Sequence, residues 1–147
     1  MAVKPIPEGY HSVTPYLLVD GADDLLEFIK QVFDARERMR MPAKDGKIGH
    51  AEVEIGDSMI MMADASTADQ GPMSAMIHVY VDDSDKTFQK ALEAGATKVR
   101  DLETQFYGDR GGGVRDRWGN VWWIATHVED VSDEEMAKRA EAAAGQT

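Results

Sequence analysis

The sequence predicts an α+β fold in which a βαβββ module occurs twice and is followed by a C-terminal helix. The order of strand, helix and strands can be read twice from the spacing of hydrophobic residues. Residues 19–23 (VDGAD) also align with residues 81–85 (VDDSD) at a shift of 62 positions. The chain has 147 residues, 43% of them hydrophobic, which is enough for one sizeable core. We therefore expect a single domain, residues 1–147, made of two similar halves.

The first module, about residues 10–65, contains the clearest helix signal. Apolar side chains at helical spacing follow the turn at Asp20 and Gly21 and predict an amphipathic helix over residues 23–33. Its apolar stripe needs a sheet to cover. Apolar and alternating runs predict the strands, and an Asp-Gly pair predicts a hairpin between the second and the third. The expected strands are residues 13–19, 36–41, 48–55 and 59–63.

The second module, about residues 75–128, follows a linker of small and polar residues at 66–74. A run that contains Gly111, Gly112 and Gly113 predicts a long loop before the last strand. The expected elements are a strand over 76–81, a helix over 86–94, and strands over 97–100 and 120–126.

The C-terminal segment is predicted to form a separate helix. Ser132 and Glu135 have the spacing of a capping box, and residues 132–144 are rich in alanine and glutamate. This acidic helix carries part of the net charge of −11.

Composition excludes several classes of function. With no cysteine, the chain has no disulfide, thiolate zinc site, iron–sulfur cluster or cysteine nucleophile. The charge of −11 opposes binding to nucleic acid and to anionic membrane surfaces. The N-terminal residues lack the apolar run of a signal peptide, and no stretch approaches the ~20 apolar residues of a membrane span. We therefore expect a cytoplasmic protein without nucleic-acid or membrane partners.

Several motifs occur in an order that resembles the vicinal oxygen chelate superfamily, of glyoxalase, bleomycin-resistance and dioxygenase type, and most closely its PhnB-like branch. The motifs are TPYLLVDGA at 14–22, GKIGHAEV at 46–53, FYGDR at 106–110 and VEDVSDEEM at 128–136. The resemblance spans about residues 10–139. It implies that the two modules pair curved mixed sheets around a cavity, often in a homodimer. Because the superfamily includes isomerases, dioxygenases and metal-free binding proteins, the fold alone does not give the function.

The resemblance also places four metal-ligand positions, at Thr14, Glu52, Met76 and Trp123. Only Glu52 supplies a good ligand, and a tryptophan has no acceptor atom at all. We therefore expect no cofactor. The alternative is a divalent metal that lies away from the position implied by the resemblance. Three residues would hold it, and strand alternation places them on the sheet faces that the helices do not cover. These residues are His50, Glu52 and His78.

The segment at 106–110 offers two further candidates, Tyr107 and Arg110. The glycines that follow would let a loop move over the cavity, and Arg110 would clamp a carboxylate or phosphonate. In the structural alternative, Arg110 pairs with Asp109 or holds a hairpin. Trp123 is expected to face the cavity, where it either stacks on a planar or cationic guest or fills the core.

The prediction for function is metal-independent binding of a small molecule in the cavity between the modules, without demonstrated catalysis. The competing class is a metal-dependent lyase, isomerase or dioxygenase that uses Glu52 with His50 or His78. The expected ligand-binding residues are Tyr16, His50, Glu52, His78, Tyr107, Arg110 and Trp123.

Overall fold

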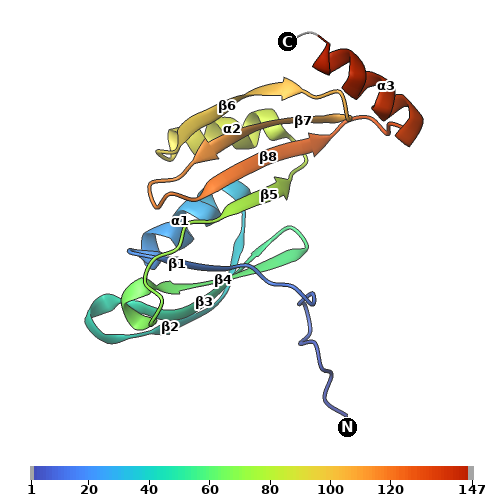
Figure 1. Cartoon of the computed structure of the whole chain (residues 1–147). Coiled ribbons are helices and arrows are strands. Elements are labelled where there is room, and N and C mark those ends of the chain that lie inside the picture. Colours follow the sequence, from blue (N-terminus) through green and yellow to red (C-terminus); the bar gives the residue numbers. More distant parts are fainter. Residues whose placement is uncertain (1, 146–147) are drawn as a thin grey trace. The chain divides into compact units, whose positions relative to one another are not determined.

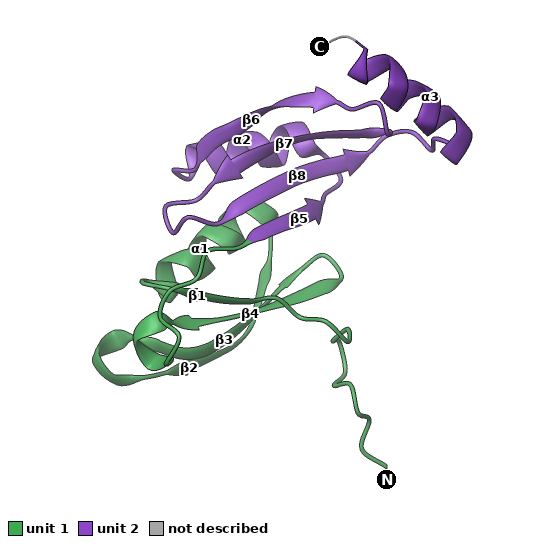
Figure 2. Cartoon of the chain, in the orientation of Figure 1, with its two compact units in different colours: residues 1–75 green, residues 76–147 purple. Residues whose placement is uncertain are grey.

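The computed structural model describes residues 2–145 and contains two compact units (Figures 1 and 2). Unit 1 ends at Ala75 and unit 2 begins at Met76. Each unit holds one four-stranded mixed sheet, in the order β1-β4-β3-β2 in unit 1 and β5-β8-β7-β6 in unit 2. The predicted α+β fold of two βαβββ modules and a C-terminal helix is confirmed.

Unit 1 packs one helix against one face of its sheet. Strands β1 and β4 are parallel, whereas the other neighbours are antiparallel. Helix α1 buries Leu25, Leu26 and Ile29 completely, and β3 buries Ala51 and Val53 in the same core. The elements are β1 (Tyr16–Val19), α1 (Ala22–Phe33), β2 (Arg36–Pro42), β3 (Ile48–Ile55) and β4 (Ser58–Asp64), with short 3-10 helices at Lys44–Gly46 and Ala65–Thr67.

Unit 2 repeats this arrangement, with β5 parallel to β8 and helix α2 on the sheet. Trp122 is fully buried, and its indole N–H donates to the buried carboxylate of Asp116 at 2.8 Å. The elements are β5 (Met76–Tyr80), α2 (Ser84–Glu93), β6 (Thr97–Thr104), β7 (Asp109–Arg115), β8 (Val121–His127) and α3 (Asp133–Ala144).

The prediction of a glycine-rich loop is wrong, because Gly111, Gly112 and Gly113 lie inside strand β7. A Cβ added to Gly112 would approach the Phe88 ring at 2.9 Å and the Arg100 carbonyl at 3.0 Å. On the other face, Cβ atoms at Gly111 and Gly113 would press on the Trp123 ring system at 3.1 and 3.2 Å. The glycines therefore let α2 approach one face of the strand and Trp123 lie across the other.

The predicted boundaries differ from the observed ones by two or more residues at three elements. Strand β6 ends at Thr104 rather than residue 100. Strand β1 begins at Tyr16 rather than residue 13, and the carbonyl of Pro15 accepts from Met61 N–H just before it. Helix α2 begins at Ser84 rather than residue 86, because the Asp83 side chain caps it by accepting from Lys86 N–H.

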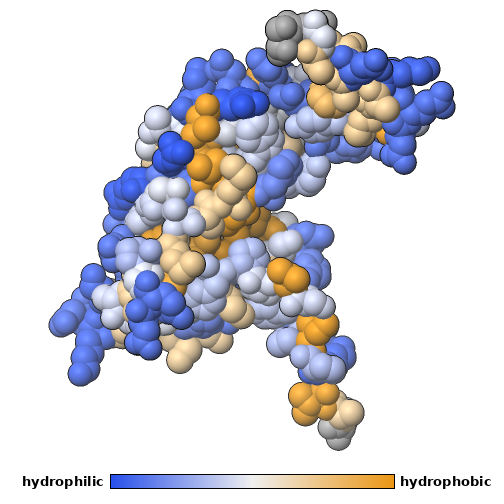
Figure 3. Space-filling model, in the orientation of Figure 1, coloured by the Kyte–Doolittle hydropathy of each residue, from blue (hydrophilic) through white to orange (hydrophobic). Residues whose placement is uncertain are grey.

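Helix α3 begins at the predicted Ser132 cap, whose Oγ accepts from Glu135 N–H, while the Glu135 carboxylate pairs with Arg139. Arg139 attaches the helix to unit 2 by donating to the Phe106 carbonyl at 3.1 Å and by pairing with Glu129. No residue of α3 is fully buried. The N-terminal arm is exposed too, and Figure 3 shows its apolar residues as separate orange patches; Val3 is 92% exposed. Among residues 2–145, no helix is long and apolar enough to cross a membrane.

The sequence repeat is also a repeat of pairing and capping. Tyr16 pairs with Met61 in unit 1, and His78 pairs with Trp123 in unit 2, each 62 positions later. At the same shift, a polar side chain caps the helix of each unit. Asp64 accepts from Ala22 N–H at 3.0 Å, and Thr126 Oγ1 accepts from Ser84 N–H at 2.8 Å.

Candidate functional site

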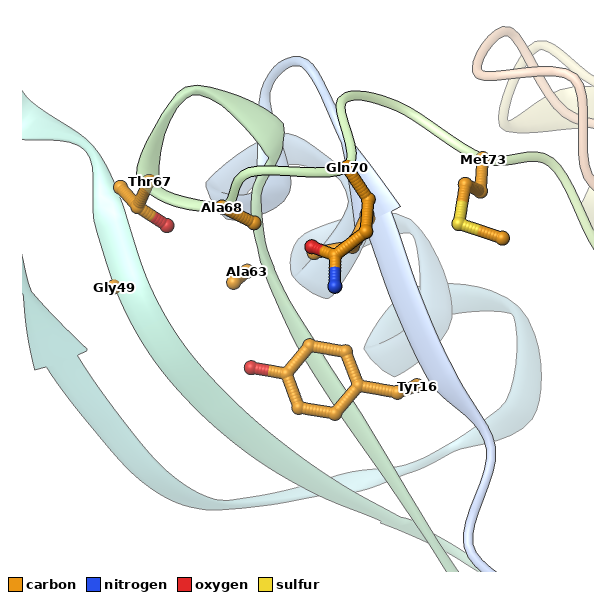
Figure 4. A pocket seen from close by; sticks show the side chains of 8 residues that line it. Tyr16, Gly49, Ala63, Thr67, Ala68, Gln70 and Met73 are labelled. Carbon is orange, nitrogen blue, oxygen red and sulfur yellow. The ribbon is translucent and has the colours of Figure 1, made fainter.

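A pocket of about 520 Å³ lies on the face of the unit 1 sheet that α1 does not cover (Figure 4). Sheet residues form its floor and the segment after β4 forms its rim. The Tyr16 ring lies along one side, and the Gln70 amide points into the space above it. This unit 1 pocket is lined by Tyr16, Leu18, Gly49, Ala63, Thr67, Ala68, Gln70 and Met73.

A chain of hydrogen bonds runs from the pocket across the sheet. Tyr16 Oη lies 2.9 Å from His50 Nδ1, and His50 Nε2 lies 2.8 Å from Glu52 Oε2. The other oxygen of Glu52 accepts from the Tyr10 hydroxyl, which the N-terminal arm supplies. We call these four residues the His50 chain.

Strand alternation in β3 explains how the sequence places the His50 chain. Ala51 and Val53 point into the core under α1, so His50 and Glu52 point to the open face. Their side chains are 24% and 14% exposed. They are therefore partly screened from water and still accessible from the sheet surface.

Burial raises the pKa of the Tyr16 hydroxyl above its usual value. The phenol therefore stays protonated at neutral pH, and it acts as a hydrogen-bonding group. A carboxylate only accepts, so Glu52 requires a proton on His50 Nε2.

The open face of unit 2 has a different character. His78 and Tyr80 lie on β5 with ring centroids 4.9 Å apart. Trp123 is half-buried on β8, and the Arg100 guanidinium lies 5.6 Å from its ring centroid. On this face, the protein's own Arg100 cation therefore stacks on Trp123, which was expected to stack on a ligand.

A second polar cluster lies at the start of β7. The buried Asp109 carboxylate accepts from Tyr80 Oη at 2.7 Å and is 2.8 Å from His127 Nδ1; His127 Nε2 is 2.8 Å from Asp130. Burial by itself would raise the pKa of Asp109, but the hydrogen bonds from Tyr80 and His127 hold it below its usual value. The hydrogen bonds to Asp109 and Asp130 raise the pKa of His127. We call these four residues the Asp109 cluster.

Arg110 makes a bidentate ion pair with Asp85, at 2.8 and 2.9 Å. The alternative in which it pairs with Asp109 is therefore wrong, while its 3.4 Å hydrogen bond to Thr104 across the β6–β7 hairpin matches the predicted hairpin role. Tyr107 lies in the turn of this hairpin, with its ring edge-on to Phe106. Burial, followed by the charge of Asp109, raises the pKa of the Tyr107 hydroxyl.

The predicted site residues thus fall into separate groups. Unit 1 brings Tyr16, His50 and Glu52 together, whereas unit 2 pairs His78 with Trp123 and holds Arg110 in an ion pair. Within either unit, no three His, Asp or Glu side chains of residues 2–145 gather in a metal-binding arrangement.

Sequence reasoning did not find Tyr10 and Gln70. Both lie outside the regular elements, in the N-terminal arm and in the segment after β4. No local pattern marks either residue, because each reaches its place through the path of a loop.

Comparisons with known proteins agree with this architecture. The sequence model of the Glyoxalase/Bleomycin resistance protein/Dioxygenase superfamily matches residues 9–124. An uncharacterized protein of Mycobacterium bovis, Mb0911c, is 36% identical over 135 residues, which cover 85% of this chain and 89% of that protein.

Solved structures show the same fold. The crystal structure of TioX from Micromonospora sp. ML1 superposes with a TM-score of 0.68 at 26% identity, covering 80% of this chain and 99% of TioX. The PhnB protein of Bacillus cereus superposes with a TM-score of 0.64 at 13% identity, over 79% and 99% of the two chains, which is a likeness of fold alone. The chain belongs to the glyoxalase/bleomycin resistance protein/dioxygenase superfamily.

Proposed function

We propose that the protein binds a small, planar, uncharged molecule in the unit 1 pocket, without a metal. The observation that carries this proposal is the pocket itself, about 520 Å³, with the His50 chain ending in its wall at Tyr16. Binding sites for small molecules are commonly 300–1,000 Å³ in volume and mostly apolar, with a few placed polar groups. The pocket matches this description.

The lining favours a flat and neutral guest. The eight lining residues carry no charge, and Leu18, Ala63 and Met73 offer apolar surface beside the Tyr16 ring. An aromatic ring stacks or packs edge-on against a tyrosine, and methionine adapts to irregular shapes. Gln70 supplies an amide that can donate or accept at the mouth of the pocket.

The hydrogen bonds of the His50 chain favour binding without a metal over the metal-dependent alternative. Both ring nitrogens of His50 lie within hydrogen-bond distance of protein groups, and both oxygens of Glu52 are engaged by His50 and Tyr10. A metal on His50 or Glu52 would have to displace these partners. We also propose a cytoplasmic homodimer of the PhnB-like branch, for which size-exclusion chromatography with light scattering measures the number of subunits.

Thermal unfolding with planar bicyclic probes tests the proposal. We expect indole or 2-naphthol to raise the melting temperature of metal-stripped protein, since a ligand at 100 times its Kd stabilises by about 2.7 kcal/mol. The Tyr16→Ala variant should lose this shift, because it removes one side of the pocket. Tyr80→Ala is the matched control, since it truncates an exposed tyrosine of unit 2.

The same assay distinguishes the alternative. Zn²⁺ or Mn²⁺ binding at micromolar concentration, abolished by His50→Ala and required for the probe shift, would replace the proposal with metal-dependent chemistry. An equal loss of the shift in Tyr16→Ala and Tyr80→Ala would place the binding site elsewhere.

A further inference from the structure

The direction of the hydrogen bonds along the His50 chain determines what the pocket offers to a ligand. Glu52 is an acceptor on both oxygens, since Tyr10 donates to one and His50 lies 2.8 Å from the other. His50 therefore donates through Nε2. In the neutral imidazole the second nitrogen, Nδ1, is then an acceptor.

The acceptor role of His50 Nδ1 also fixes the direction of the hydrogen bond between His50 and Tyr16. Nδ1 of His50 lies 2.9 Å from Tyr16 Oη, so the phenol proton is directed at the histidine. The hydroxyl oxygen keeps free lone pairs but has no proton left to give. Tyr16 therefore presents an acceptor to the pocket, although an isolated tyrosine could act in either sense.

We propose that the unit 1 pocket selects planar aromatic molecules that carry a hydrogen-bond donor, such as an aryl N–H or O–H, and that Tyr16 Oη is the acceptor that recognises it. Glu52 and His50 act as positioning residues, because they fix the proton of Tyr16 without contacting the ligand. This inference rests on the proposed function and specifies its ligand class.

The selectivity comes from the cost of an unpaired group. When a ligand places an acceptor atom against Tyr16 Oη, the lone pair of that atom faces the lone pair of the hydroxyl oxygen. The two repel each other, and the ligand atom loses the hydrogen bond that it made with water. A net hydrogen bond of the ordinary size corresponds to roughly five- to tenfold in affinity. Probes of the same shape bury the same apolar surface, so a difference between their affinities reports the hydrogen bond to Tyr16.

Three bicyclic probes separate these effects at pH 8, in calorimetric titrations. Indole carries an N–H donor, benzofuran has nearly the same shape without the donor, and quinoline carries only an acceptor nitrogen. We expect indole to bind about five- to tenfold more tightly than benzofuran, with quinoline the weakest. In Tyr16→Phe the affinity for indole should fall to that for benzofuran, which itself should not change.

A second variant tests the role of His50. The His50→Leu change removes the acceptor of the Tyr16 proton, so the phenol becomes free to donate and the affinity for quinoline should rise about fivefold. The matched controls are Tyr80→Phe and His127→Ala, which remove a hydroxyl and an imidazole from the Asp109 cluster. Both controls should keep the preference for indole.

The outcomes separate the two proposals. Equal affinity for indole and benzofuran in the wild-type protein overturns the donor preference and leaves binding in the pocket intact. A preference that survives Tyr16→Phe overturns the assignment to Tyr16. If none of the three probes binds, the proposed function and the donor preference both fall.

Discussion

The two units have the same strand order, but they place large and small side chains at different equivalent positions on the sheet face that the helix does not cover. In each unit, one row of paired positions runs across three neighbouring strands, from the edge strand to the next two strands of the sheet. The rows are Tyr16, Met61 and Glu52 in unit 1, and His78, Trp123 and Gly113 in unit 2. Where unit 1 places a flexible side chain beside a carboxylate, unit 2 places an indole beside a glycine.

This difference shows how one backbone supports two kinds of surface. In unit 2, Trp123 occupies the space above Gly111 and Gly113, with Arg100 stacked on it. In unit 1, the strand beside Met61 carries His50 and Glu52, and the pocket opens beside Tyr16. The proposed site therefore lies in unit 1, which has no tryptophan to fill its open face.

The largest expected difference between the units concerns the side chains that cap α1 and α2. Asp64 is buried and accepts from the N–H groups of Gly21, Ala22 and Ile48, at 2.7–3.0 Å. Asp64→Ala leaves three donors without this partner and should lower the free energy of unfolding by about 3 kcal/mol. Thr126→Val, the change 62 positions later, removes one such acceptor and the hydrogen bond from the same hydroxyl to the Val81 carbonyl, and it should cost about 1.5 kcal/mol. Urea unfolding measures both.

The control for this comparison is Thr67→Val, which removes a side-chain hydrogen bond from the 3-10 helix that follows Asp64. It should cost less than Asp64→Ala, because it leaves all three N–H groups paired. Equal losses in Asp64→Ala and Thr126→Val would mean that the two caps are interchangeable.

The next effect concerns glycines on the two sheets. Gly112→Ala places a Cβ 3.0 Å from two backbone atoms of β6, the Arg100 oxygen and the Leu102 nitrogen. Overpacking against backbone should cost about 2 kcal/mol of unfolding free energy. Gly49→Ala on β3 is the matched control, because its Cβ would meet no atom closer than 3.6 Å. Its expected change lies within about 0.5 kcal/mol. A tolerated Gly112→Ala would show that α2 and β6 have room to move away from β7.

The fold could be predicted wherever hydrophobic spacing follows the period of the element. Residues 48–55 alternate so regularly that β3 matches its predicted bounds, and the stripe of α1 ends at Phe33 as expected. Strand β7 could not be found this way, because Gly111 to Gly113 have no side chains to alternate. The reason for the glycines lies in α2 and β8, which are far away in the sequence.

The candidate site was only partly predictable for a similar reason. Alternation placed His50 and Glu52 on one face, and Tyr16 was among the expected ligand-binding residues. Tyr10 was not expected, because it reaches Glu52 from 42 positions away in the sequence. Arg110 was expected to clamp a ligand or, in the structural alternative, to pair with Asp109 or hold a hairpin, and its bidentate partner is Asp85 at the start of α2. Long-range partners of this kind leave no local pattern.

The smallest expected effect is a pH dependence of opposite sign at two side chains, Asp64 in unit 1 and His127 in unit 2. Burial by itself would raise the pKa of Asp64, but three backbone N–H groups hold it below its usual value. Its contribution to stability is therefore present above the ordinary carboxyl pKa and is lost as the pH falls through the lowered value. The hydrogen bonds from His127 to Asp109 and Asp130 raise the pKa of His127. That contribution is complete below the ordinary imidazole pKa and is lost as the pH rises through the raised value.

Urea midpoints between pH 2 and pH 9 resolve the two limbs. Asp64→Asn should make the acid limb shallower and leave the alkaline limb unchanged. His127→Gln should remove the alkaline limb, and it should also make the acid limb somewhat shallower, because the hydrogen bond from His127 helps to hold the pKa of Asp109 below its usual value. The alkaline limb should be the shallower one, since half of the His127 side chain is exposed and water screens its charge. NMR titration of the His127 ring protons measures the raised pKa directly, and Asp130→Asn should bring it down. An unchanged His127 titration in Asp130→Asn would mean that Asp109 alone holds the imidazolium, because the remaining 2.8 Å contact is the one to the buried carboxylate.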